Sequence, residues 1–217
     1  MESPSWTGGS FSSPVPAASV GPTDRPRAID WSRAFEDPRP KSWYDRPAPD
    51  VARALVGDWL VVRAPEGWRA GRLVETEAYG PKDPASHAFR GPTARNRSMF
   101  AAPGTLYVYR IHQVCCANLT ARSGQAVLLR AVEPATGGLS ATRGPGRLCR
   151  AFGLTREDDG ASAVTGSRIR VVRGPSIRGP IVTGPRVGIR RARSRPWRFG
   201  LARNGWVSSP RPPGWSG

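Results

Sequence analysis

The chain has 217 residues, of which 38% are hydrophobic; this allows one globular core and favours one domain over two. Its formal net charge of +17 and its pI near 11.5 indicate a polyanionic partner, for which nucleic acid is the obvious candidate. Arginine carries nearly all of this charge, because Lys41 and Lys82 are the only lysines. A GC-rich genome would produce the same arginine bias without functional meaning.

Cysteine spacing and the apolar runs exclude further classes. Cys115, Cys116 and Cys149 have neither the spacing of a zinc knuckle nor that of a secreted disulfide framework, so we expect a reducing compartment. The apolar runs are too short to span a bilayer, and the N-terminus lacks a basic region followed by an apolar stretch. We therefore expect a soluble, cytoplasmic protein that is not exported.

The two ends of the chain differ in composition from its middle. Residues 1–40 are rich in Ser, Pro and Gly without helical or strand periodicity, so we expect a disordered leader. Residues 209–217 have a similar composition, and we expect a flexible tail. The folded domain should span residues 41–208.

The first predicted elements are a helix and a β-hairpin. Asp50 to Val56 should form a helix that begins near Pro49 and ends at Gly57. Residues 59–63 and 69–79 then read as two strands, because Pro and Gly in residues 64–68 mark a turn between them.

The later elements are short. Thr93 should cap a helix that runs through Met99, and Gly144-Pro-Gly should open a helix from Arg147 to Phe152. The β-branched and aromatic content predicts strands at residues 105–111 and 126–132, with closing strands at 186–189 and 197–201. The sum predicts an α+β fold: a single domain on a mixed, mostly antiparallel, strongly curved β-sheet with short flanking helices.

Candidate chemistry lies on the second predicted strand. A period of two puts Glu75, Glu77 and Tyr79 on one face. Two carboxylates so close together would raise the pKa of one of them, which suits a general base. A neighbouring aromatic ring suits a pocket for a nucleobase. Taken alone, the stretch is also compatible with a solvated strand face.

The remaining aromatic and imidazole residues allow two interpretations. Tyr107 and Tyr109 share a strand face, which indicates core packing or stacking on a nucleobase. His87 and His112 are the only histidines, and a lone histidine is more often structural than catalytic. The Cys, Asp and Glu residues near them do not recur at a ligand-type spacing, so we expect no metal, and we also expect no cofactor.

Together these pieces form a family pattern. Val74-Glu-Thr-Glu-Ala-Tyr79, His87, Arg95-Asn-Arg-Ser-Met-Phe100 and Pro103-Gly-Thr-Leu-Tyr-Val-Tyr109 occur in order, followed by Asn118, residues 127–134, Gly144-Pro-Gly-Arg-Leu-Cys149 and Arg186-Val-Gly-Ile189. This order and spacing closely resemble the 3-methyladenine DNA glycosylases, also called alkyladenine or methylpurine glycosylases. The resemblance covers residues 50–208, and several motifs in register make it specific.

The resemblance implies a base-excision repair enzyme and a role for each matched residue. Glu77 falls at the general base that activates water, and Arg130 at an active-site arginine near the flipped nucleotide. Tyr79, His87 and Tyr109 fall at the aromatic cage around the extruded base, and Asn118 at the residue that disfavours guanine. We expect contacts to the DNA backbone from Arg95 and Arg97.

The implied substrates are alkylated purines in double-stranded DNA, such as 3-methyladenine and 7-methylguanine. These are cationic, so aromatic faces attract them by about 0.5 to 2 kcal/mol. Hypoxanthine and ethenoadenine are neutral and need a proton on the leaving group, and the sequence does not identify the acid. The expected protein is a monomer without AP lyase activity, associated with the bacterial nucleoid.

One loop departs from the family pattern. Where the family has a tyrosine that wedges into the gap left by the flipped base, residues 110–118 are one residue shorter and His112 is the positional match. His112 is therefore expected to intercalate, alone or helped by a neighbour, although an exposed imidazole at a turn would look the same in sequence.

Two other functions remain compatible with the sequence. One is a basic lesion-binding or nucleic-acid-binding protein with weak or no catalysis, since charge alone predicts binding to phosphate. The other is a diverged glycosylase that turns over slowly. A carboxylate repels phosphate, so Glu77 favours an enzyme over a pure binding protein.

Overall fold

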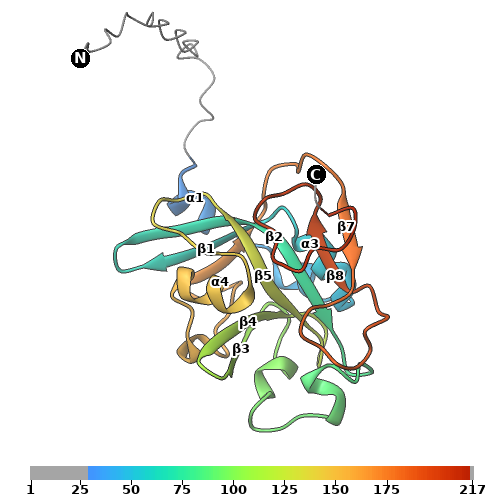
Figure 1. Cartoon of the computed structure of the whole chain (residues 1–217). Coiled ribbons are helices and arrows are strands. Elements are labelled where there is room, and N and C mark those ends of the chain that lie inside the picture. The colour runs from blue at the N-terminus through green and yellow to red at the C-terminus, as the bar shows by residue number, and fades with distance from the viewer. Residues whose placement is uncertain (1–28, 216–217) are drawn as a thin grey trace, which may run out of the picture.

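The computed structural model describes residues 29–215, which form one antiparallel sheet with short helices around it (Figure 1). The sheet runs in the order β3-β4-β5-β2-β1-β6, with β8 also paired to β2 and β7 to β8. The strands are β1 (Trp59–Ala64), β2 (Gly67–Tyr79), β3 (Leu106–Ile111), β4 (Val114–Thr120), β5 (Ala126–Pro134), β6 (Ile169–Val172), β7 (Ile181–Gly184) and β8 (Arg198–Leu201).

Strand β2 organises the sheet because it pairs with three neighbours. Its first half pairs with β1, residues 71–79 pair with β5, and Glu75 to Glu77 also pair with β8. A β-bulge between Leu73 and Thr76 interrupts the ladder with β5. The bulge lies next to the carboxylates of β2. Bulges increase strand twist and change the direction of the side chains near them.

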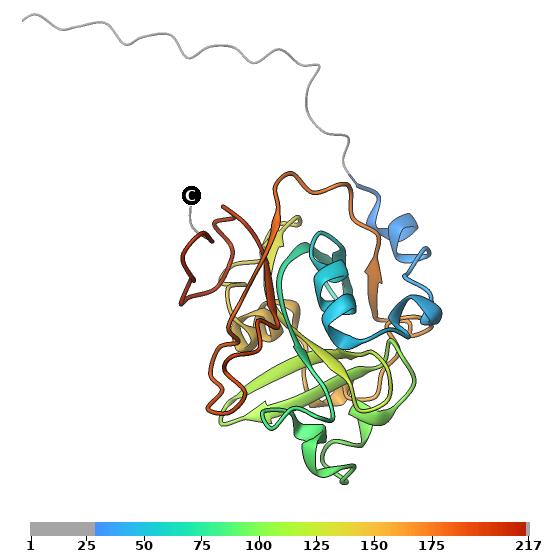
Figure 2. The same cartoon turned by 90° about the vertical axis from the view of Figure 1, so that its right-hand side faces the viewer.

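The helices cover the sheet and its edges. The main hydrophobic core lies between the sheet and the two eight-residue helices, of which α3 packs on β2 and α4 on β4. Residues 80–104, with two 3-10 helices, project beside β3 (Figures 1 and 2). The helices are α1 (Trp31–Phe35), α2 (Lys41–Tyr44), α3 (Ala48–Leu55), α4 (Pro145–Phe152), η1 (His87–Arg90), η2 (Arg97–Phe100) and η3 (Arg156–Asp158).

The predicted α+β class and the antiparallel, curved sheet are confirmed, and the predicted hairpin is β1 and β2. Strands β4, β6 and β7 carried no predicted element. No helix among residues 29–215 is long and apolar enough to cross a membrane.

Two predicted elements differ from the structure. Residues 186–189 are not a strand, because the backbone N–H of Val187 is donated to the Glu77 side chain and not to a strand. The helix expected from Thr93 begins only at Arg97, because Thr93 donates its N–H and its hydroxyl to Asn96 Oδ1 and forms a turn.

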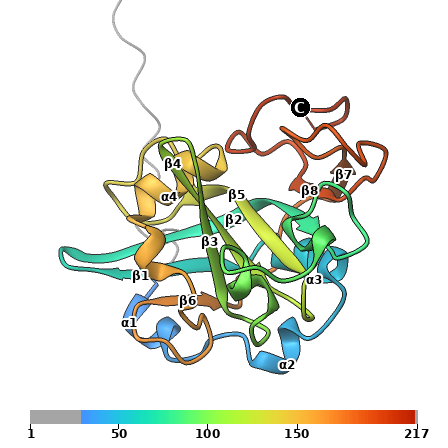
Figure 3. The same ribbon diagram turned by 90° about the horizontal axis from the view of Figure 1, so that it is seen from below.

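The structure also differs from the expected boundaries at both ends. Within the expected leader, Phe35 on α1 is buried and Arg39 forms an ion pair with Asp58 at 2.7 Å. Within the expected tail, Trp215 is buried against Gly200, where a side chain would collide with the indole ring. These two ends of the described chain lie on different sides of the molecule (Figure 3). Residues 1–28 of the leader and 216–217 of the tail lie outside the described residues.

Candidate active site

A narrow cavity, which we call the slot, opens between β3, β5, η1 and residues 187–189. Its volume is about 250 Å³, which suits a small planar ligand. Its wall contains five of the predicted site residues, namely Tyr79, His87, Tyr109, Asn118 and Arg130, which the sequence spreads over residues 79–130. The lining comprises Tyr79, Ala85, His87, Met99, Tyr107, Tyr109, Ile111, Cys116, Asn118, Leu128, Arg130, Pro145, Val187, Gly188 and Ile189.

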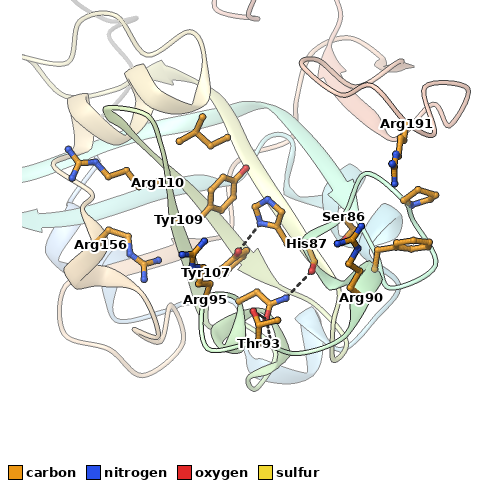
Figure 4. A pocket seen from close by; sticks show the side chains of 14 residues that line it. Ser86, His87, Arg90, Thr93, Arg95, Tyr107, Tyr109, Arg110, Arg156 and Arg191 are labelled. Atoms are coloured by element: carbon orange, nitrogen blue, oxygen red, sulfur yellow. Dashed lines mark hydrogen bonds between the residues drawn. The ribbon is translucent and has the colours of Figure 1, made fainter.

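Aromatic rings form one side of the slot. Strand alternation turns Tyr107 and Tyr109 toward it, with ring centroids 5.4 Å apart. The His87 ring lies edge-on to Tyr109 at 4.6 Å, and its Nδ1 is hydrogen-bonded to the Tyr107 hydroxyl at 2.8 Å (Figure 4). Burial raises the pKa of Tyr107 to about 12 and lowers the pKa of His87, so both groups are neutral at pH 7. The rings are thus held as an uncharged aromatic wall.

Glu77 is fully buried and does not line the slot, but it contacts three residues that do, Tyr79, Arg130 and Val187. The Tyr79 hydroxyl donates to its Oε2 at 2.7 Å, and the Val187 N–H donates to its Oε1 at 2.7 Å. Arg130 Nη1 lies 3.3 Å from Oε1. Burial raises the pKa of this carboxyl, although the Arg130 charge and the two hydrogen bonds oppose the rise. The carboxyl is therefore closer to protonation than an ordinary glutamate.

Glu75, two residues earlier, has a fuller set of partners. Arg130 Nε and Arg198 Nε donate to its Oε1 at 2.8 and 2.7 Å. Ser208 donates its N–H to Oε2 at 2.6 Å and its hydroxyl to Oε1 at 2.9 Å. The two carboxylates share Arg130, as their common strand face predicts. Burial is the largest cause of the raised Glu77 pKa; repulsion by Glu75 acts in the direction expected from the sequence but contributes least.

Arg186 packs against Tyr79, which lines the slot, and the sequence analysis assigned it no role. Its guanidinium is buried between the rings of Tyr79 and Trp197, 4.6 and 5.5 Å from their centroids. It pairs with the buried Asp83 and donates to the Ala78 carbonyl at 2.9 Å. The next residue is Val187, so this clamp holds the N–H that bonds Glu77. Its signal in sequence was its place in the Arg-Val-Gly-Ile motif.

Asn118 presents one polar atom to the slot. Its Nδ2 donates to the carbonyls of Tyr107 at 2.9 Å and Cys116 at 3.4 Å. These two carbonyls fix the amide orientation, so the atom left to face the slot is the carbonyl oxygen Oδ1.

A wider cavity, which we call the basin, lies outside the slot and shares His87, Tyr107, Tyr109 and Ile111 with it (Figure 4). Its volume is about 760 Å³, and its fourteen lining residues include no carboxylate. Positive charge there comes from five arginines on separate segments: Arg90, Arg95, Arg110, Arg156 and Arg191.

Two predicted residues lie apart from both cavities. Arg97, on η2, is exposed and does not line the basin, unlike Arg95. His112 is exposed in the two-residue turn between β3 and β4, with a positive φ of 49°, and lines neither cavity. Within residues 29–215, no group of three or more His, Cys, Asp or Glu side chains is placed to hold a metal ion.

Comparisons with known proteins agree on one family. The model of the family described as methylpurine-DNA glycosylase matches residues 42–205. A protein of Agrobacterium fabrum named "Putative 3-methyladenine DNA glycosylase" is 45% identical over 190 residues, which cover 82% of this chain and 95% of the relative. Proteins with the same name from Anaeromyxobacter dehalogenans and Methanocella arvoryzae are 48% and 43% identical, over 81% of this chain in each case and over 87% and 97% of the relatives.

Proposed function

The chain belongs to the methylpurine-DNA glycosylase family and is a DNA glycosylase, and from this premise we propose that it excises alkylated purines from double-stranded DNA. The proposed substrates are 3-methyladenine and 7-methylguanine, with hypoxanthine and ethenoadenine as neutral candidates. The observation that carries the proposal is the fully buried Glu77, hydrogen-bonded to Tyr79, which lines an aromatic slot.

The proposed reaction is direct hydrolysis of the N-glycosidic bond. Glu77, in its ionised form, takes a proton from a water at the point where Tyr79, Arg130 and Val187 meet. The oxygen of that water bonds to C1′ of the deoxyribose, and the bond from C1′ to the purine nitrogen breaks. The bonding electron pair leaves with the purine, so a cationic N-alkylated base departs neutral and needs no further acid.

The slot selects the base in this proposal. A purine can reach it only after the nucleotide rotates out of the duplex, at a cost of a few kcal/mol that is smallest for a weakly paired lesion. Tyr79, His87 and Tyr109 then stack on it, and the faces of the tyrosine rings attract a cationic purine. Asn118 opposes the edge of the base that carries the 2-amino group in guanine, and it disfavours unmodified guanine by steric conflict with that group.

DNA binding follows from the charge outside the slot. Arg95 in the basin and Arg97 on η2 contact the backbone, while Arg130 lies beside the flipped nucleotide. The gap left in the duplex is filled by a residue at the end of the β3–β4 hairpin, and the family resemblance implied His112 for this role. The protein works as a monomer on the chromosome, because one DNA-binding face is sufficient.

We also propose that the enzyme is monofunctional. Strand cleavage by a glycosylase needs an amine that forms a Schiff base with the sugar. Lys41 and Lys82 are the only lysines, and neither lines the slot. Borohydride should therefore fail to trap the protein on damaged DNA, and efficient trapping would refute direct hydrolysis.

The decisive experiment incubates the protein with methylated DNA and separates the liberated bases by chromatography. Release of free 3-methyladenine would support the proposal that the protein excises alkylated purines. Binding to damaged DNA without release would instead support the lesion-binding alternative, which the arginines of the basin would serve equally well. Deaminated and etheno-adduct DNA extend the same assay to the neutral candidates.

A further inference from the structure

An exposed apolar side chain lies at the boundary between the slot and the basin. Among residues 29–215 only three large apolar side chains are strongly exposed, namely Ile29, Phe89 and Ile111, at 43%, 46% and 45%. Ile111 alone of these lines both cavities, whereas Phe89 lines only the basin. An exposed apolar group among polar neighbours commonly marks a contact surface.

The surroundings of Ile111 place it where a duplex would be opened. On the proposed function, the damaged base occupies the slot and the phosphates lie among the arginines of the basin. A side chain at the boundary between the two therefore lies beside the position that the base has left. Arg110 and Gln113, which flank it and the turn, are hydrogen-bonded to each other at 3.2 Å and form a polar edge around it.

Ile111 is also held more firmly than its neighbour His112. It is the last residue of β3, paired with Val114 of β4, and branching at its Cβ restricts the χ1 angle of its side chain. Strand alternation places it on the face that carries Tyr107 and Tyr109. His112 lies in the turn beyond, off that face, and lines neither cavity.

We propose that Ile111, and not His112, fills the gap left in the duplex when the damaged nucleotide enters the slot. The inference rests on the proposed function. Proteins that bend DNA insert apolar side chains such as isoleucine as wedges between base steps, which opens the base stack at that point. A short, rigid wedge also suits a hairpin whose turn is only two residues long.

The test measures purine release from methylated DNA as duplex and as heat-denatured single strands, and compares the ratio of the two rates. A wedge is needed only where a base stack must be opened. Ile111→Ala should therefore lower the duplex-to-single-strand ratio by about tenfold, since unstacking costs a few kcal/mol. Ile111→Leu should restore most of the ratio, and His112→Ala should change it less than Ile111→Ala does.

Ile29→Ala is the matched control, because it makes the same substitution at nearly the same exposure outside the proposed site. It should leave both rates unchanged. Equal loss in the two DNA forms for Ile111→Ala would overturn the inference, since the side chain would then only shape the slot. A larger drop for His112→Ala would also overturn it. In both cases the wild-type enzyme still releases purines, whereas absence of release by the wild-type enzyme from both DNA forms would mean that the proposed function itself has failed.

Discussion

The surroundings of the two glutamates on β2 offer the most informative comparison in the molecule. Glu75 and Glu77 are the same residue type, two positions apart on one strand, and both are fully buried. Glu75 receives four hydrogen bonds, two of them from the guanidinium groups of Arg130 and Arg198. Glu77 receives two hydrogen bonds, from Tyr79 and Val187, and shares Arg130 at a longer distance.

The difference shows that burial alone does not produce a candidate base. Charged partners offset the desolvation of a buried carboxylate, and the region around Glu75 supplies two of them. That region ties β2, β5, β8 and Ser208 together and has a structural role. The region around Glu77 supplies less charge, so burial raises its pKa and leaves a carboxyl able to accept a proton.

The largest expected effect is on activity at Glu77. Glu77→Gln should lower purine release by at least about 100-fold, because general base catalysis typically contributes that much. The amide has nearly the same shape, so lesion binding should be largely retained. Release is measured by chromatography and binding by fluorescence anisotropy; retained turnover would remove Glu77 from its proposed role.

The second effect is on stability at Glu75. Glu75→Gln leaves the buried Arg130 and Arg198 without their main counter-charge, so the free energy of unfolding should fall by about 3 kcal/mol. Urea denaturation of the purified protein measures it. Glu157→Gln, at an exposed position of η3, is the control and should be within about 0.5 kcal/mol of wild type. Similar stability of the two variants would show that Glu75 does not hold β2, β5 and β8 together.

The third prediction concerns pH. A carboxyl with a raised pKa is protonated below that pKa and can act as a base only above it. Release should therefore rise with pH through an apparent pKa above the ordinary value of 4.5, and fall by about tenfold per pH unit on the acid side. Single-turnover rates between pH 4 and 8, each at about the same ionic strength, give the profile. A rate of purine release that stays constant down to pH 4.5 would contradict a raised pKa for the Glu77 carboxyl.

The smallest effect is expected behind the slot. Arg186→Lys keeps the charge opposite Asp83 but loses the planar group between Tyr79 and Trp197. The Val187 N–H should then bond Glu77 less firmly, and since this bond lowers the Glu77 pKa, the acid side of the profile should move to higher pH. We expect release at neutral pH to fall by about threefold, which corresponds to about 0.7 kcal/mol and lies in the range of one hydrogen bond.

Arg195→Lys is the matched control for this variant, because Arg195 also stacks on Trp197, at 4.6 Å, but lies at the surface. It should leave the profile in place. An unshifted profile for Arg186→Lys would show that Arg186 acts only on stability.

Much of the fold could be predicted from local sequence. The turn at residues 64–68 and the apolar content around it predicted the β1–β2 hairpin, Gly57 marked the end of α3, and Gly144-Pro-Gly marked the start of α4. Strand β4 was missed because residues 110–118 were interpreted as a loop. Strands β6 and β7 are only four residues long, too short for a reliable periodicity.

The candidate site could be predicted only in part. Alternation along β2 placed Glu77 and Tyr79 on one face, and motif spacing singled out His87, Tyr109 and Asn118. Arg186 was missed because a buried arginine cannot be distinguished from a surface arginine in a chain with 33 basic residues. Ile111 was missed because exposure of an apolar strand residue depends on where the sheet ends.

The sequence by itself determined the family, the strand that carries the carboxylates and the residue types that can form an aromatic slot, because these follow from short-range spacing. Only the tertiary structure decided which carboxylate is surrounded by two guanidinium groups and which is left with a raised pKa. The partners that make this difference lie far away in the chain: Ser208 is 133 residues from Glu75, and Val187 is 110 residues from Glu77. A pKa depends on the distance to charges and donors in space, and folding alone sets those distances.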